Sequence, residues 1–195
     1  MSKNIEPKLA KPGAGLPFFE LLLTRYWILP RMSSSMSWEE AHQMFLSEGE
    51  KILKLIEPIS LENMDRKILI PHVKGLEDSS RYWSIAMTLE HLMIIGDLFA
   101  LIVEDLGRHK EVKSNLTLAD VKPRALLAAG DAKKTFREFL PKITKRVMAP
   151  DLDRDSPNTA THPWFSKINV RKWNWLLGSH QWIHRQQIKE ILKRL

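Results

Sequence analysis

Hydrophobic residues recur at steps of three and four along four long segments of the chain, with polar residues between them. This is the period of an amphipathic α-helix that turns one face toward a core. The segments span residues 38–57, 79–107, about 122–141 and 169–195. Alternating strand patterns are almost absent. Four such helices joined by mostly polar links predict an all-α protein, a four-helix bundle.

The last segment has the clearest pattern of the four. Asn169 stands directly before it and can cap the first turn with its side-chain oxygen. We therefore expect one helix that begins after Asn169. Its inward-facing stripe consists of Trp173, Leu176, Leu177, His180, Ile183, His184, Gln187, Ile188, Ile191 and Leu195.

Capping residues indicate where the first two bundle helices begin and end. Ser37, followed three residues later by Glu40, forms a capping box for the first. Ser79 or Ser80 is available as the cap of the second, and Gly107 stands where helices commonly stop. The second segment is apolar around most of its circumference, which predicts a central, well-covered helix.

Prolines and polar composition define the third bundle helix and the links. Pro123 suits a first-turn position near the start of the third helix, and Pro141 is expected to bend or end it. Residues 59–78 lack clear periodicity, so we predict a long connection with a short extended piece at 67–73. Residues 148–162 have the composition of a loop.

The N-terminal part differs in composition from the bundle. Residues 1–15 are rich in Lys, Pro and Gly, which predicts a flexible end. A short apolar helix is expected over residues 17–29 and should stop before Pro30. An extra helix that covers the domain or makes a dimer contact explains it better than membrane docking. We therefore divide the chain into this extension, 1–35, and the bundle, 36–195.

Composition restricts the chemistry and the location. The 195-residue chain has no cysteine, so a bound metal would need imidazole or carboxylate ligands. The net charge of +7 is spread along the chain, as on a solvated surface, and does not favour a nucleic-acid-binding tract. No run approaches the ~20 apolar residues of a membrane-spanning helix. The apolar stretch 16–29 is a poor signal peptide, so we expect a cytoplasmic protein without a membrane partner.

Histidine spacing supplies the candidate chemistry. His180 and His184 are one helical turn apart on the apolar stripe, so both imidazoles can reach one cation. His91 is the single histidine of the apolar second helix. Three histidines form the ligand set of open catalytic metal sites, in which a remaining position is left for water or substrate.

Other residues are candidates for the surroundings of this site. Two residues are candidate catalytic groups. Glu48, on the first helix, could act as a base or support the metal ligands from a second shell. Gln187, one turn after His184, could donate a hydrogen bond to substrate or to a metal-bound water. His162 can line the pocket or cap a backbone group, and we favour the second, structural role. The candidate pocket residues are Ser84, Met87, Thr88, His162 and Trp173.

Three stretches together resemble a known family. They are WSIAMTLEHL, HPWFSKIN and WNWLLGSHQWIHRQQIKEI, in this order over roughly residues 36–195. This arrangement resembles the DinB-like (DinB/YfiT) superfamily, whose members show a histidine in the second helix, an HP-x-F segment and a closing H-x-x-x-H. The chain departs from that pattern at Ser166, where many relatives have glycine, and in its apolar N-terminal helix.

The resemblance implies a four-helix bundle that binds a divalent metal, commonly nickel or zinc, through His91, His180 and His184. It also implies a homodimer and a metal-dependent enzyme acting on a small-molecule substrate, by S-transfer from a low-molecular-weight thiol or by hydrolysis. The alternative is a non-catalytic, stress-associated module whose metal is structural or absent, closed by a fourth ligand such as Glu90 or Glu48. A third hypothesis, a nucleic-acid-binding protein, is less favoured.

Overall fold

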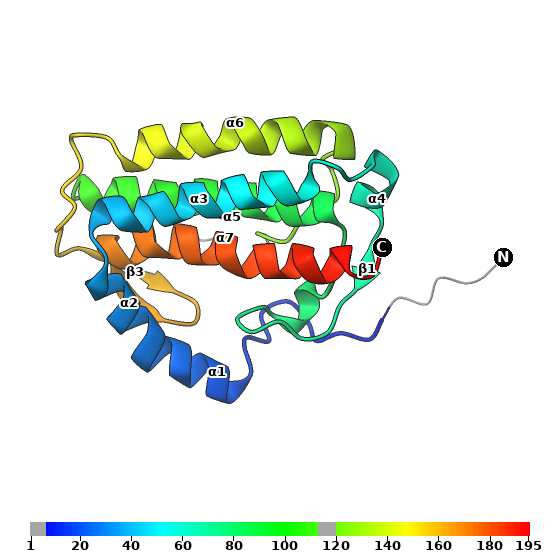
Figure 1. Ribbon diagram of the computed structural model, residues 1–195. Coiled ribbons are helices and arrows are strands. Elements are labelled where there is room, and N and C mark those ends of the chain that lie inside the picture. Colours follow the sequence, from blue (N-terminus) through cyan, green and yellow to red (C-terminus); the bar gives the residue numbers. More distant parts are fainter. Residues whose placement is uncertain (1–6, 113–119) are drawn as a thin grey trace.

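The computed structural model describes residues 7–112 and 120–195, and it shows the predicted four-helix bundle. The bundle helices are α3 (Trp38–Ile56), α5 (Ile85–Gly107), α6 (Ala129–Val147) and α7 (Val170–Leu192). In Figure 1 they lie side by side, with α6 at the top and α7 at the bottom of the bundle. α7 packs on both α3 and α5, and α6 packs on α5 and α3.

Local capping signals fix several of the helix ends as predicted. The Ser37 side chain accepts from the Glu40 N–H and the Glu40 carboxylate accepts from the Ser37 N–H, which completes the capping box of α3. The Asn169 side chain accepts from the Lys172 N–H at the start of α7. α5 ends at Gly107.

The start of α5 was predicted wrongly. The helix begins at Ile85 with Ser84 as its cap, and not at Ser79 or Ser80. The preceding residues are used in a small antiparallel ladder between β1 (Ile68–Leu69) and β2 (Tyr82–Trp83). Pairing with a distant strand therefore overrides a local capping signal.

The start of α6 was also predicted wrongly. It begins at Ala129, so Pro123 lies outside the helix. The segment before it is held in an irregular conformation because its polar groups bond to distant partners. The Val121 carbonyl contacts His91, and the Arg124 N–H donates to Glu90.

Two prolines lie within helical segments that continue past them. α6 extends beyond Pro141 to Val147, so this proline does not end it. The N-terminal helix also continues past Pro30, contrary to the prediction. It runs as α1 (Phe18–Leu23), a π-helical segment (Thr24–Ile28) and α2 (Leu29–Ser35). The wider π turn, with Leu29 N–H donating to the Thr24 carbonyl, places Pro30 in the first turn of α2, where a helix needs no proline N–H.

The links contain more structure than their composition predicted. The connection 59–78 includes α4 (Leu61–Asp65) beside the predicted extended piece, and the loop 148–162 ends in β3 (Thr159–His162). β3 pairs with β4 (Ser166–Asn169) in an antiparallel hairpin. Of the predicted flexible end, residues 1–6 lie outside the described residues. Residues 7–15 were predicted wrongly, because they are fastened to the bundle through Asp78 and Glu77.

α5 is the central helix, and most of its residues are buried. Among the described residues it is long and apolar enough to cross a membrane by length and composition, contrary to the prediction that no run is so apolar. However, 67% of that apolar window is buried inside the bundle. This burial is the pattern of a core helix.

Gly178 allows α7 to approach α3 closely, and its replacement tests this packing. A Cβ at Gly178 would lie 2.9 Å from the backbone nitrogen of Phe45, so one helix would have to move. We expect Gly178→Ala to lower the free energy of unfolding by about 1–3 kcal/mol, despite the better helix propensity of alanine. Gly130→Ala is the matched control, because a Cβ there meets only Leu61 at 4.0 Å. Urea unfolding should show the control unchanged or stabilised; a stabilised Gly178→Ala would contradict this packing.

Candidate metal centre

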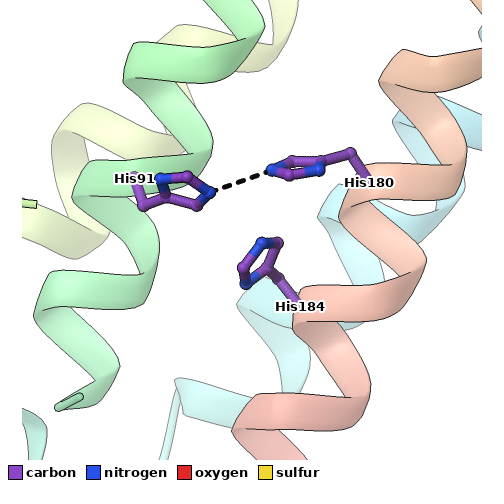
Figure 2. A group of neighbouring side chains, drawn as sticks. All are labelled: His91, His180 and His184. Atoms are coloured by element: carbon purple, nitrogen blue, oxygen red, sulfur yellow. Dashed lines mark hydrogen bonds between the residues drawn. The ribbon is translucent and has the colours of Figure 1, made fainter. Parts of the chain in front are cut away.

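Three histidines from two helices converge inside the bundle. His91 comes from α5, and His180 and His184 come from α7, as Figure 2 shows. One ring nitrogen of each lies within 4.8 Å of the others. The structure therefore brings together the three residues that the sequence predicted as metal ligands.

The outer nitrogens of two of these rings are held by buried partners. His91 Nδ1 lies 2.7 Å from the Val121 carbonyl, and His184 Nδ1 lies 2.6 Å from Gln187 Oε1. Both oxygens are acceptors, so each Nδ1 carries the proton and each Nε2 keeps a lone pair. Gln187 in turn donates from Nε2 to the Ser80 carbonyl at 2.7 Å. Such outer-shell partners orient metal-binding histidines.

Burial keeps the three imidazoles neutral. It lowers the pKa of His184 to about 4. It also lowers the pKa values of His91 and His180 well below their ordinary value, and the mutual repulsion of the ring charges acts in the same direction. Neutral rings are the form in which histidine binds a metal.

The residues fit a divalent metal. His180 Nε2 lies 3.1 Å from His91 Nε2 (Figure 2), and since His91 keeps a lone pair there, His180 donates this hydrogen bond. A cation would be bound by all three Nε2 lone pairs, with the His180 proton moved to its Nδ1. His91, His180 and His184 would hold it, and three neutral nitrogen ligands would leave its charge uncompensated.

Aromatic rings surround the histidines. The Trp83 ring is stacked parallel to His184 at 6.1 Å between centroids and lies 5.0 Å from His91. Phe99 contacts His180 edge-on at 5.8 Å. These rings exclude water from part of the site, which strengthens electrostatic interactions within it.

Two of the predicted pocket residues lie at this site. His162 and Trp173 both line the cavity next to the histidines. His162 also performs the structural role, because its Nδ1 accepts from the Trp164 N–H at 3.1 Å. Burial lowers the pKa of His162 to about 4. The Trp173 indole N–H is buried without an acceptor among the described residues.

The other three predicted pocket residues lie elsewhere. Ser84 and Met87 line a separate, smaller cavity beside the start of α5. Thr88 is fully buried and donates from its hydroxyl to the Ser84 carbonyl. They were predicted wrongly because position along the helix does not show which side the neighbouring elements cover.

Neither catalytic candidate is free to act on a substrate. The Glu48 carboxylate is paired with Lys51 at 2.7 Å and with Arg185 at 2.5 Å. Burial alone would raise its pKa, but the hydrogen bonds from these two cations outweigh burial and lower it. Gln187 is fully buried and both ends of its amide are engaged, so it positions His184. Glu90 is not in the histidine cluster, and one of its oxygens accepts from Arg124 N–H.

Ser166, where the chain departs from the family pattern, has a backbone conformation that favours glycine. Its φ is +64°, in the left-handed region that favours glycine. The residue begins β4 directly after the Pro163–Phe165 turn that carries the HP-x-F segment. Glycine would adopt this conformation without strain. The strain caused by the serine is confined to the turn, because the three histidines lie on α5 and α7.

A cavity of about 1070 Å³ opens from the histidines. Its walls come from α5, α7, the β3–β4 hairpin, the connection around residues 74–80 and the N-terminal helix. All three histidines line it. A bound metal would therefore face a space large enough for an organic ligand.

Sequence reasoning missed a buried ion pair beside the site. Lys122 Nζ donates to Glu77 at 2.7 Å and to the hydroxyls of Ser79 and Ser80. Its ammonium also lies 5.2 Å from the centroid of the Trp83 ring. These residues are far apart in the sequence, and no spacing pattern links Lys122 to Glu77.

Comparison with known proteins supports the fold and goes no further. No family model matches the chain, and no curated protein matches it. The chain is similar to a solved structure described as "Crystal structure of TT2238, a four-helix bundle protein". The TM-score is 0.50 at 21% identity, over 78% of this chain and 98% of that one. At this identity the likeness shows a four-helix bundle fold, and the DinB-like resemblance remains a prediction.

Proposed function

We propose that this protein is a metal-dependent enzyme that acts on a small molecule at the three-histidine centre. The observation that carries the proposal is the convergence of three neutral imidazoles at the wall of a large cavity. This ligand set leaves a coordination position for water or substrate. The cation, nickel or zinc by resemblance, would lower the pKa of a bound water or thiol and so supply a nucleophile near neutral pH.

The chain's own residues would prepare this chemistry. Val121 and Gln187 fix the tautomers of His91 and His184, so that both Nε2 atoms are available at neutral pH. Trp83 and Phe99 exclude water beside the rings. Glu48 and Glu90 lie outside the group of ligands, which favours an open site over the alternative of a closed structural metal.

A cobalt-substituted protein tests the proposal and separates its two reaction types. Addition of a small thiol should produce a thiolate-to-cobalt charge-transfer band if the centre performs S-transfer. Hydrolysis predicts instead that activated esters are cleaved by the metal-loaded protein and not after chelation. A protein that binds cobalt but shows neither thiol binding nor metal-dependent turnover would support the non-catalytic alternative.

We also propose that two copies of the chain associate through the N-terminal helix. Its outer face carries large apolar side chains that are 63% to 81% exposed, namely Phe18, Phe19, Tyr26 and Trp27. Its inner face, with Thr24 and Ile28, lines the cavity. Contiguous exposed apolar surface of this kind marks an interaction site.

Sedimentation of a double variant tests the dimer. Phe19→Asp with Trp27→Asp should convert the dimer to a monomer, because charges would be buried in the contact. The fold should be retained, since both side chains are mostly solvated in the single chain. A wild-type protein that sediments as a monomer, or that floats with lipid vesicles, would contradict the proposal.

A further inference from the structure

The cavity beside the histidines is much larger than a metal ion and its water require. Its volume of about 1070 Å³ slightly exceeds the ~300–1,000 Å³ usual for small-molecule sites. A site that only bound and polarised a small polar molecule would not need this space. The shape of the cavity and its lining therefore carry information about the ligand.

The cavity is elongated along two helices. The cavity is lined on α5 by residues of one helix face, namely His91, Ile95, Leu98, Phe99, Ile102 and Leu106. From His91 to Leu106 this face is about 22 Å long, at ~1.5 Å per residue. The histidines stand at one end of it.

α7 lines the same space in the opposite direction. His184 lies against His91 with ring centroids 4.7 Å apart, whereas Trp173 lies against Phe99 at 5.1 Å. The two helices are therefore antiparallel along the cavity. The wall away from the histidines is completed by Ile28 and Met32 of the N-terminal helix and by Phe165 of the hairpin.

The charge at the histidine end is already compensated. Lys122 lines the cavity there, but Glu77 neutralises it at 2.7 Å and two serine hydroxyls accept its other protons. A small thiol with several carboxylates would find this cation occupied. Between His91 and Leu106 the cavity walls are mainly apolar, and the charged residues Lys110 and Glu111, which follow Leu106 in the sequence, also line the cavity.

We infer that the ligand of this cavity is a long-chain amphiphile, with a metal-binding head at the three histidines and an apolar chain along α5 and α7. This inference rests on the proposed function for the position of the head. It specifies the substrate class as a molecule with an extended aliphatic chain, such as a fatty acyl derivative. Burial of this aliphatic chain supplies most of the binding affinity.

Alkyl hydroxamates on cobalt-loaded protein test the inference. Acetohydroxamate, octanohydroxamate and dodecanohydroxamate share one metal-binding head and differ only in chain length. The head should change the cobalt d–d spectrum in the same way for all three. Each added methylene should strengthen binding by roughly two- to fourfold, up to the length of the cavity.

A variant that partly fills the cavity shows where the aliphatic chain of the ligand lies. Ile102→Trp adds volume to the cavity wall about three turns beyond His91. It should therefore weaken the binding of dodecanohydroxamate at least tenfold and leave the binding of acetohydroxamate unchanged. Leu101→Trp is the matched control, because Leu101 is 46% exposed and lies outside the cavity lining. If Ile102→Trp does not fold, Ile102→Phe provides the same test with a smaller ring.

The outcomes distinguish this inference from the proposed function. Equal affinity for the three probes, with the expected spectral change, would overturn the amphiphile and leave the metal function standing. Weakening of all probes alike by Ile102→Trp would also overturn it. If calorimetry detects dodecanohydroxamate binding but the cobalt spectrum never changes, the open metal position is wrong and the head is not at the histidines.

Discussion

Replacement of His184 with alanine is expected to abolish stoichiometric metal binding. His184 supplies one of three ligand nitrogens that lie within 4.8 Å of one another, and no other described residue belongs to this group. Loss of an outer-shell partner alone weakens metal binding about 10–100-fold, so loss of a ligand should exceed ~100-fold. Elemental analysis of purified, dialysed protein measures the effect, with one ion per wild-type chain expected.

His42→Gln is the matched control for that experiment. His42 is also a buried histidine, but it lies on α3 and contacts Thr144 at 3.1 Å, away from the cluster. Its replacement should leave the metal content unchanged. Equal metal in His184→Ala and wild type would show that the three histidines are not the binding site.

Removal of the Glu77 carboxylate is expected to have the second large effect, on stability. Glu77 is 5% exposed and accepts hydrogen bonds from Lys122, Ser79 and the backbone of Gly13 and Gly15. Glu77→Ala would leave the Lys122 ammonium without its counterion. We expect a loss of about 2–4 kcal/mol in unfolding free energy, near the range for broken buried ion pairs and reduced because Lys122 keeps some exposure.

The same change should weaken metal binding about tenfold, because Lys122 adjoins Val121, whose carbonyl orients His91. Asp155→Ala provides the control: its ion pair with Arg171 is largely exposed, and urea unfolding should show little change. A Glu77→Ala protein as stable as Asp155→Ala would contradict the role assigned to this pair.

Low pH should reduce the contribution of Glu77 to the stability of the fold. Burial raises the pKa of Glu77, but hydrogen bonds from Lys122 and Ser79 outweigh burial and hold it below its ordinary value of 4.5. The folded state therefore favours the ionised carboxylate. Its contribution to stability is present above pH 4.5 and is lost as the pH falls through the lower, folded pKa. The difference in stability between wild type and Glu77→Ala should shrink over this range.

Features of the fold that depend on neighbouring residues were predictable from the sequence. The capping box at Ser37 and the cap at Asn169 use side chains and backbone groups three residues apart, so the pattern contains both partners. The starts of α5 and α6 depend instead on pairing across the fold. Trp83 pairs with Ile68, and the Val121–Arg124 segment bonds to α5, which no local pattern indicates.

The candidate site likewise has one part that could be predicted from the sequence and one part that could not. The one-turn spacing of His180 and His184 and the single histidine of the most apolar helix were sufficient to predict the cluster. The groups that support the rings were not predictable, because they include main-chain carbonyls of Val121 and Ser80, which have no side-chain signature. Gln187 was identified, but its role was wrong, since its distant partner at Ser80 fixes its orientation.

Anomalous diffraction from crystals of the metal-loaded protein, recorded at the absorption edge of the metal, tests the central claim most directly. We predict one peak bound by Nε2 of His91, His180 and His184 at about 2.0–2.1 Å for zinc, with a water or another exogenous ligand facing the cavity. A peak away from the three histidines would contradict the metal centre. A fourth protein ligand that closes the coordination shell would contradict the proposed catalytic function.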